Sequence, residues 1–159
     1  MKIILAFLTI LCFSAGFSQE KSFSTEALKD LVINTSGSEV TFESVLEKHK
    51  GKTVLIDIWA SWCKDCIEGF PDLKKLQKEN PNEFYVFLSL DKDTERWKEG
   101  IDKYKLQGSH YFIKSGWKGP LCNSIDLDWI PRYILLDESG KIKVYKAITT
   151  KDNQLLNQI

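Results

Sequence analysis

TVLIDIWASWCKDC, residues 53–66, joins an almost continuously apolar run to two cysteines separated by two residues. The run at 54–59 predicts a strand that is covered on both faces of a parallel sheet. From 64 to 79 apolar residues recur at helical spacing, and Asn80-Pro81-Asn82 ends that pattern. Cys63 is therefore expected where a buried strand gives way to a helix.

The rest of the chain predicts one α/β unit built around this strand and helix. A second apolar run at 84–90 completes a strand–helix–strand unit, which is right-handed when its strands are parallel. The chain after residue 19 shows no repeat, no low-complexity tract and no long charge run. The element order predicts a central mixed sheet with helices on both faces. The other predicted elements are an irregular stretch at 19–38, a short strand at 40–42, a helix at 43–50, a helix at 94–104 after a cap at Asp93 or Thr94, a hairpin of strands 132–136 and 141–145, and a last helix within 151–159.

Length and composition indicate a single domain with no net charge. The chain has 159 residues, of which 43% are hydrophobic and 28% are charged, and it carries 22 basic and 22 acidic residues. A chain of this length can bury one sizeable hydrophobic core but is too short for two domains with a core each. The neutral balance gives no reason to expect nucleic acid or an anionic membrane surface as partner.

The first eighteen residues have the pattern of a secretory signal peptide. Lys2 precedes an apolar stretch that runs to Phe13, and small residues follow up to Ser18. The apolar stretch is shorter than the ~20 residues needed to span a bilayer. We expect cleavage after Ser18, export to the periplasm or cell envelope, and a mature domain at 19–159. The alternative is a retained membrane anchor.

The mature chain keeps three cysteines, Cys63, Cys66 and Cys122, which is an odd number for an oxidising compartment. At the start of a helix, the Cys63 sulfur would face unpaired amide hydrogens that stabilise a thiolate. Cys66 follows one helical turn later and could resolve a mixed disulfide. The pair therefore predicts a working redox couple, with Cys122 as a buried apolar filler.

Asp57 interrupts the apolar strand at 54–59. A buried carboxylate is costly unless it titrates or has a partner. Lying six residues before Cys63, it could accept the proton of Cys66 during resolution. The alternative is a carboxylate that is paired with a lysine or solvated at the strand end.

The motifs together resemble the thioredoxin fold family, most closely its secreted TlpA/ResA-like thiol–disulfide oxidoreductases. The resemblance rests on Asp57, WASWCKDC at 59–66, Pro71 and WIPRYILLDESGKI at 129–142, and it extends over about 38–148. It implies that the residue matching Cys63 attacks, that Cys66 resolves and that Asp57 assists proton transfer. It also implies a cis Ile130–Pro131 bond facing the cysteines, and a substrate groove framed by Trp62, Ile130 and Pro131.

Two features depart from that family pattern. The residues between the cysteines are Lys64 and Asp65, where thioredoxin has Gly-Pro. Lys64 favours a thiolate and Asp65 opposes it, so the pattern leaves the reduction potential open. The acid after the motif is Glu68, two residues beyond Cys66, whereas TlpA-like relatives often carry it three residues beyond.

Residues 105–128 are long for a connection and contain five residues suited to binding or packing. We expect an insertion that forms a rim of the active-site groove, and the alternative is that its aromatic side chains fill a satellite core. The residues concerned are His110, Tyr111, Phe112, Trp117 and Cys122.

Three other functions compete with the redox reading. A zinc or copper site would need His110 and Cys122 in addition to the CxxC pair, which supplies only two ligands. A peroxidase would need a PxxxTxxC pattern, which the chain lacks. A partner-binding module that has lost its chemistry is less compatible with an intact Cys63, Cys66, Asp57 and Pro131.

The sequence thus predicts an exported oxidoreductase that reduces disulfides by dithiol exchange. It needs no bound cofactor or metal, because the Cys63–Cys66 disulfide is itself the redox group. Cysteine-containing exported proteins are the expected partners, together with an upstream thiol electron donor, and the domain is expected to be a monomer without a membrane span once the signal is removed. An oxidase or isomerase would carry the same motif.

Overall fold

The computed structural model describes residues 21–159, so the predicted signal peptide lies outside the described residues. Thirteen helices and strands follow one another in this part of the chain. They are α1 (Thr25–Leu28), β1 (Leu31–Asn34), β2 (Glu39–Thr41), α2 (Phe42–Lys48), β3 (Val54–Trp59), α3 (Lys64–Glu79), β4 (Phe84–Ser89), α4 (Thr94–Tyr104), β5 (Ser109–Ile113), α5 (Pro120–Ser124), β6 (Arg132–Leu136), β7 (Ile142–Ala147) and α6 (Asn153–Leu156).

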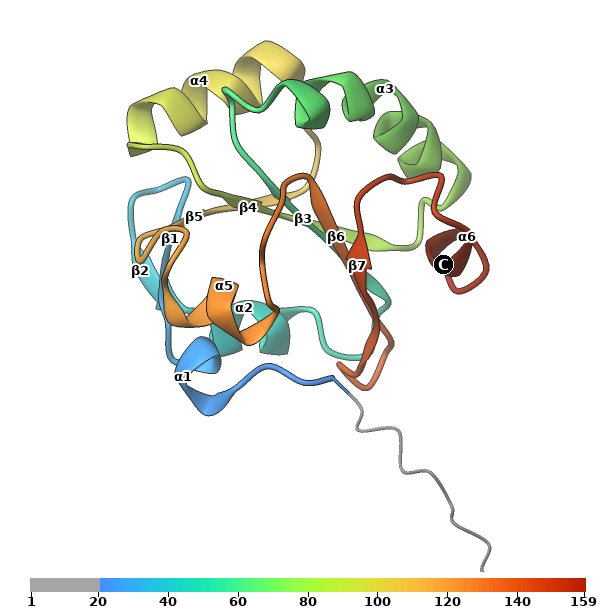
Figure 1. Cartoon of the computed structure of the whole chain (residues 1–159), viewed down its shortest axis with the longest axis horizontal. Helices are drawn as coiled ribbons and strands as arrows, with labels where there is room; N and C mark the ends of the chain where they lie inside the picture. Colours follow the sequence, from blue (N-terminus) through green and yellow to red (C-terminus); the bar gives the residue numbers. More distant parts are fainter. Residues whose placement is uncertain (1–20) are drawn as a thin grey trace, which may run out of the picture.

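The strands form one mixed sheet in the order β2-β1-β5-β4-β3-β6-β7. β3, β4 and β5 are parallel, and the strands on either side of these three run antiparallel to their neighbours. In Figure 1, α3 and α4 cover one face of the sheet while α1, α2 and α5 cover the other. This is the predicted fold class, a thioredoxin-like mixed sheet with helices on both faces.

β3 lies in the interior of the sheet, between β4 and β6, and all six of its residues are buried. Its register with β4 pairs Trp59 with Ser89, so both strands end at the same edge. The chain leaves β3 at that edge and enters α3 at Lys64. The predicted strand 54–59 and helix 64–79 are confirmed, and their junction positions the cysteines.

The predicted insertion at 105–128 is wrong as a description of the fold. Residues 109–113 form β5, which pairs with β4 on one side and with β1 on the other. His110 and Tyr111 are buried in this strand. His110 stacks on Phe87 with ring centroids 4.8 Å apart. These aromatic residues therefore belong to the main sheet and its core, not to a surface insertion.

The amino-terminal stretch 19–38 was expected to be irregular, but it contains α1 and β1. Val32 in β1 is fully buried, because the strand pairs with both β2 and β5. The other corrections concern where predicted helices and strands begin and end. Phe42 begins α2 instead of closing a strand, β7 continues to Ala147, and the last helix is only Asn153–Leu156.

Candidate active site

Cys63 and Cys66 form a disulfide at the amino end of α3. The S–S distance is 2.15 Å, and the bridge spans the first turn of the helix. Cys63 is 6% exposed while Cys66 is fully buried. The two sulfurs therefore differ in accessibility, and a partner thiol or disulfide can approach only from the Cys63 side.

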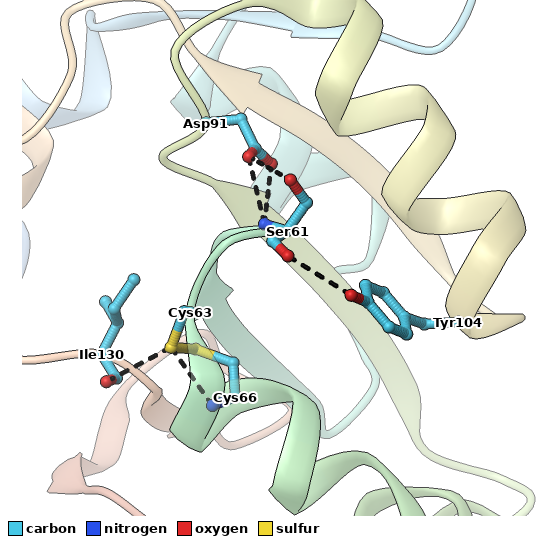
Figure 2. Close-up of a disulfide and its surroundings, with 6 residues drawn as sticks. All are labelled: Ser61, Cys63, Cys66, Asp91, Tyr104 and Ile130. Carbon is cyan, nitrogen blue, oxygen red and sulfur yellow. Dashed lines mark hydrogen bonds between the residues drawn. A yellow bond between two sulfur atoms is a disulfide. The ribbon is translucent and has the colours of Figure 1, made fainter.

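Helix geometry favours a charged sulfur at Cys63. Cys63 is the N-cap of α3, and the backbone N–H of Cys66 donates to its Sγ at 3.1 Å. The same sulfur lies 3.6 Å from the carbonyl oxygen of Ile130 (Figure 2). An amide hydrogen bond and the positive end of the helix both lower the pKa of a thiol. Cys63 is thus placed to react as a thiolate once the disulfide is reduced.

The charges beside the cysteines largely compensate one another. Lys64 forms an ion pair with Glu68 at 3.6 Å, and both side chains are well exposed. Asp65 follows in the first turn of the helix. An exposed pair of this kind is worth little energy. Glu68 therefore has a partner within the motif itself.

Asp57 is buried in β3 without a compensating partner among the described residues. The residue is 2% exposed, and neither carboxylate oxygen has a hydrogen-bond partner among residues 21–159. Burial raises its pKa from 3.8 to about 8. The alternative of a lysine-paired or solvated carboxylate is wrong, because the side chain has no partner among the described residues and is almost completely shielded from solvent. Asp57 can hold a proton at neutral pH.

Tyr133 is the neighbour of Asp57 on the adjacent strand. The two residues face each other in the β3–β6 register. Burial raises the pKa of the Tyr133 hydroxyl, and the charges of Asp57 and Asp72 add to that effect. A β-carbon at Gly69 in α3 would lie 3.4 Å from the same hydroxyl oxygen. Tyr133 therefore fills the space between Asp57's strand and the cysteine helix.

The loop between β3 and Cys63 is held by Asp91, which sequence reasoning missed. Ser61 donates to this carboxylate through its backbone N–H, 3.1 Å from each oxygen, and through its hydroxyl at 2.7 Å. Ser89 donates a further hydroxyl at 2.8 Å. Asp91 follows β4, and Ser61 follows β3, at the edge where both parallel strands end (Figure 2). The contact between Ser61 and Asp91 could therefore have been predicted from the two parallel strands.

Helix α4 supports the same loop from the other side. The Tyr104 hydroxyl donates to the carbonyl oxygen of Ser61 at 3.4 Å (Figure 2). A β-carbon at Gly100 would lie 2.8 Å from Cβ of Ser61 and 3.0 Å from the Trp59 ring. Glycine is therefore required for α4 to approach this closely. The backbone that carries Cys63 is fixed from two sides.

A groove of about 320 Å³ opens beside Cys63. Its lining residues come from the loop and first turn around the cysteine and from two later segments, and they are Trp62, Cys63, Lys64, Asp65, Trp117, Trp129 and Ile130. A larger cavity of about 680 Å³ lies between Phe23 and the β6–β7 turn, with no cysteine in its lining. The volume of a cavity therefore does not identify the reactive site in this protein.

The structure brings together most of the residues that the sequence singled out. Trp62 and Ile130 line the groove with Cys63, while Pro131 is buried beside it. The Ile130–Pro131 bond is cis, as the resemblance implied. Trp117 from the 105–128 segment reaches the rim, which confirms the expected position for that residue alone.

The residues of the metal alternative lie apart from one another. His110 is in β5, and Cys122 is buried in α5, where burial and the charge of Asp30 raise the pKa of its thiol to about 12. Within residues 21–159, no group of three or more His, Cys, Asp or Glu side chains could hold a metal ion. None of the helices described is both long and apolar enough to cross a bilayer.

Residues 23–159 match the sequence profile of the Redoxin family. The chain belongs to that family. It is 33% identical over 109 residues to the thioredoxin-like protein YneN of Bacillus subtilis, covering 64% of this chain and 59% of that relative. It is 26% identical over 157 residues to the thiol–disulfide oxidoreductase ResA of Bacillus thuringiensis, covering 91% of this chain and 87% of ResA.

A solved structure supports the same family and fold. The thiol–disulfide oxidoreductase from Bacteroides fragilis superposes with a TM-score of 0.69 at 26% identity, covering 84% of this chain and 96% of that one. Thiol–disulfide oxidoreductases are thus among the homologues of this Redoxin chain, and its CxxC pair, Cys63–Cys66, is closed as a disulfide.

Proposed function

We propose that this Redoxin-family protein is a thiol–disulfide oxidoreductase that reduces disulfides in exported proteins. The observation that carries the proposal is the position of Cys63, which caps α3, accepts the Cys66 amide hydrogen and is the accessible member of the pair. These are the requirements for a nucleophilic thiolate next to a resolving thiol.

The proposed reaction transfers two electrons in two displacements. The Cys63 thiolate attacks one sulfur of the client disulfide, the client S–S bond breaks, and the departing sulfur leaves as a thiolate that takes up a proton. Cys66 then loses its proton and attacks Cys63, which releases the second client thiolate. The client gains two electrons and two protons, and the enzyme pair is oxidised to the disulfide found in the structure.

The ionised form of Asp57 is the proposed acceptor of the Cys66 proton in the second displacement, so the protonated carboxyl first releases its own proton to solvent. Its pKa of about 8 lies close to that of an ordinary thiol, so a proton can pass between the two groups at low cost near neutral pH. A permanently charged or hydrogen-bonded carboxylate would be a weaker base. The unpartnered state of Asp57 therefore suits this role.

The reducing direction is part of the proposal, and it requires a thiol electron donor that returns the Cys63–Cys66 pair to the dithiol. A strong disulfide oxidant owes its potential to a highly stabilised thiolate in the reduced form. Here the sulfur accepts one amide hydrogen, and the adjacent Lys64 pairs with Glu68. The N-terminus of α3 and this amide hydrogen bond stabilise the thiolate, so the reduction potential of the pair decides the direction.

The reduction potential of the Cys63–Cys66 pair tests the direction. The mature domain is equilibrated with dithiothreitol or glutathione buffers, and we expect a value below about −230 mV, whereas a value above about −180 mV would assign an oxidase or isomerase instead. Insulin reduction tests the mechanism: Cys63→Ala should abolish turnover, and Cys66→Ala should accumulate a mixed disulfide. Undiminished turnover in either variant contradicts the two-step scheme.

Export is proposed from residues 1–18 and has its own test. If the signal is cleaved as the sequence predicts, the protein recovered from the envelope fraction begins at Gln19. A product that retains Met1 in the membrane fraction would instead assign a membrane-anchored domain.

A further inference from the structure

Every tryptophan that reaches solvent in this protein faces the groove beside Cys63. The chain has five tryptophans, of which Trp59 and Trp97 are fully buried in the core. The other three line the groove, and their exposed fractions are 56% for Trp62, 37% for Trp117 and 55% for Trp129. Large exposed apolar side chains that gather in one place are typical of a binding surface.

The three indoles come from separate segments that only the fold brings together. Trp62 precedes α3, Trp117 lies between β5 and α5, and Trp129 directly precedes Ile130 and the cis bond. Their convergence on one sulfur is therefore a property of the tertiary structure. The cysteine in the groove wall also restricts the occupant, since a molecule seated there presents its own sulfur to Cys63.

The charges in the groove do not suit a small anionic thiol. Its lining contains one basic residue, Lys64, and one acidic residue, Asp65. Lys64 is already paired with Glu68 at 3.6 Å. A carboxylate-rich disulfide such as oxidised glutathione thus meets no uncompensated cation in this lining. The remaining contact surface is provided mainly by indole rings.

The volume of the groove fits side chains better than a cofactor. Pockets that enclose a small-molecule ligand measure about 300 to 1,000 Å³, and this one, at about 320 Å³, is at the lower limit. An extended peptide could place one or two bulky side chains in it while its cysteine meets Cys63. Aromatic side chains gain additional energy from packing against other aromatic rings.

We infer that this groove selects protein disulfides whose cysteine is flanked by bulky apolar or aromatic residues. The inference rests on the proposed function and adds its substrate class. The occupant is an extended cysteine-bearing segment of a client protein: its side chains pack on Trp62, Trp117 and Trp129, a bond forms between its sulfur and that of Cys63, and its former partner cysteine leaves as a thiolate. Clients are thus recognised by the residues that a folded protein normally buries.

Two neutral peptide disulfides and oxidised glutathione test the inference. One peptide is the capped homodimer of Ser-Trp-Cys-Trp-Ser and the other that of Ser-Ser-Cys-Ser-Ser, and the second-order rate constant with the reduced mature protein is measured for each. The readout is the ratio of the two peptide rate constants, which cancels the active fraction of each preparation. We expect a ratio of about ten or more in favour of the tryptophan-flanked disulfide.

Variants then locate the origin of that ratio. Trp117→Ala and Trp129→Ala should each lower it by about threefold or more, and Trp117→Phe and Trp129→Phe should retain most of it. Phe84→Ala is the matched control, because Phe84 is an aromatic residue of similar exposure, 38%, at the start of β4 and outside the groove. Its ratio should equal that of the wild type, and thermal unfolding checks that each variant is folded.

The outcomes separate the inference from the function on which it rests. Equal rates for both peptides, a ratio that survives both alanine variants, or a faster reaction with oxidised glutathione than with either peptide would overturn the selectivity. Failure to reduce any of the three disulfides would overturn the proposed reductase function instead, and the selectivity with it.

Discussion

Asp57 should make the oxidised protein less stable as the pH rises from 4 to 8. The unfolded chain ionises this group near its ordinary pKa of 3.8, whereas the folded chain keeps the proton until about pH 8. Within this interval the folded state binds more protons than the unfolded state, so each increase in pH favours unfolding. The stabilising effect of keeping Asp57 neutral is complete below pH 4 and is lost progressively above it.

The magnitude follows from the two pKa values. About three pH units separate 3.8 from pH 7, and each is worth about 1.36 kcal/mol, which gives a cost of about 4 kcal/mol at pH 7. Domains of this size are stable by about 5 to 15 kcal/mol in total. Asp57→Asn keeps the shape of the side chain and removes the ionisation. We expect the variant to be more stable than the wild type by about 4 kcal/mol at pH 7, and nearly equal to it at pH 4.

Urea unfolding of the oxidised mature protein measures this difference at pH 4.5, 6 and 7.5. Other ionisable groups are common to both proteins, so they cancel in the difference between variant and wild type. Asp102→Asn, an exposed position in α4, is the matched control and should give a difference that does not change with pH. If the difference for Asp57→Asn stays constant within about 1 kcal/mol from pH 4.5 to 7.5, the carboxyl does not retain its proton in the folded state and the reasoning is refuted.

Two further predictions concern Asp91 and Cys122. Asp91→Asn removes acceptor capacity for the Ser61 amide and hydroxyl, so the free energy of unfolding should fall by about 1 to 3 kcal/mol in urea titrations, while Asp102→Asn should leave it unchanged. The Cys122 thiol has a pKa raised to about 12 by burial and by Asp30, so the native oxidised mature protein should react with Ellman's reagent only over hours and gain one fast-reacting thiol in urea. Labelling of the native protein within minutes would show that Cys122 is accessible.

The sequence was sufficient for the part of the site that lies on contiguous residues. The change from an unbroken apolar run to helical spacing occurs between Trp59 and Lys64, and this change located Cys63 at the helix start. Asp57 could be recognised because a single acid in a six-residue buried strand requires an explanation. Both conclusions depend on local periodicity, which a single sequence displays directly.

The sequence was not sufficient where burial depends on distant partners. SHYFI at 109–113 contains a histidine and two aromatic residues in five positions, and it resembles a binding segment as much as a strand. It becomes a central strand because β1, about eighty residues earlier, pairs with its outer edge. The convergence of Trp117 and Trp129 on Cys63 likewise follows from the sheet order, which the local pattern does not contain.

Comparison of the two buried aspartates indicates why Asp57 has no partner. Asp91 is also buried, yet it accepts hydrogens from Ser61 and Ser89 and fixes the loop that carries the nucleophile. The fold can therefore satisfy a buried carboxylate when its role is structural. Donors around Asp57 would stabilise its ionised form and lower its pKa toward the ordinary value, where it would be a poor acceptor for a thiol proton. The absence of donors around Asp57 thus keeps its pKa close to that of a thiol, which is the property that the proposed proton transfer requires.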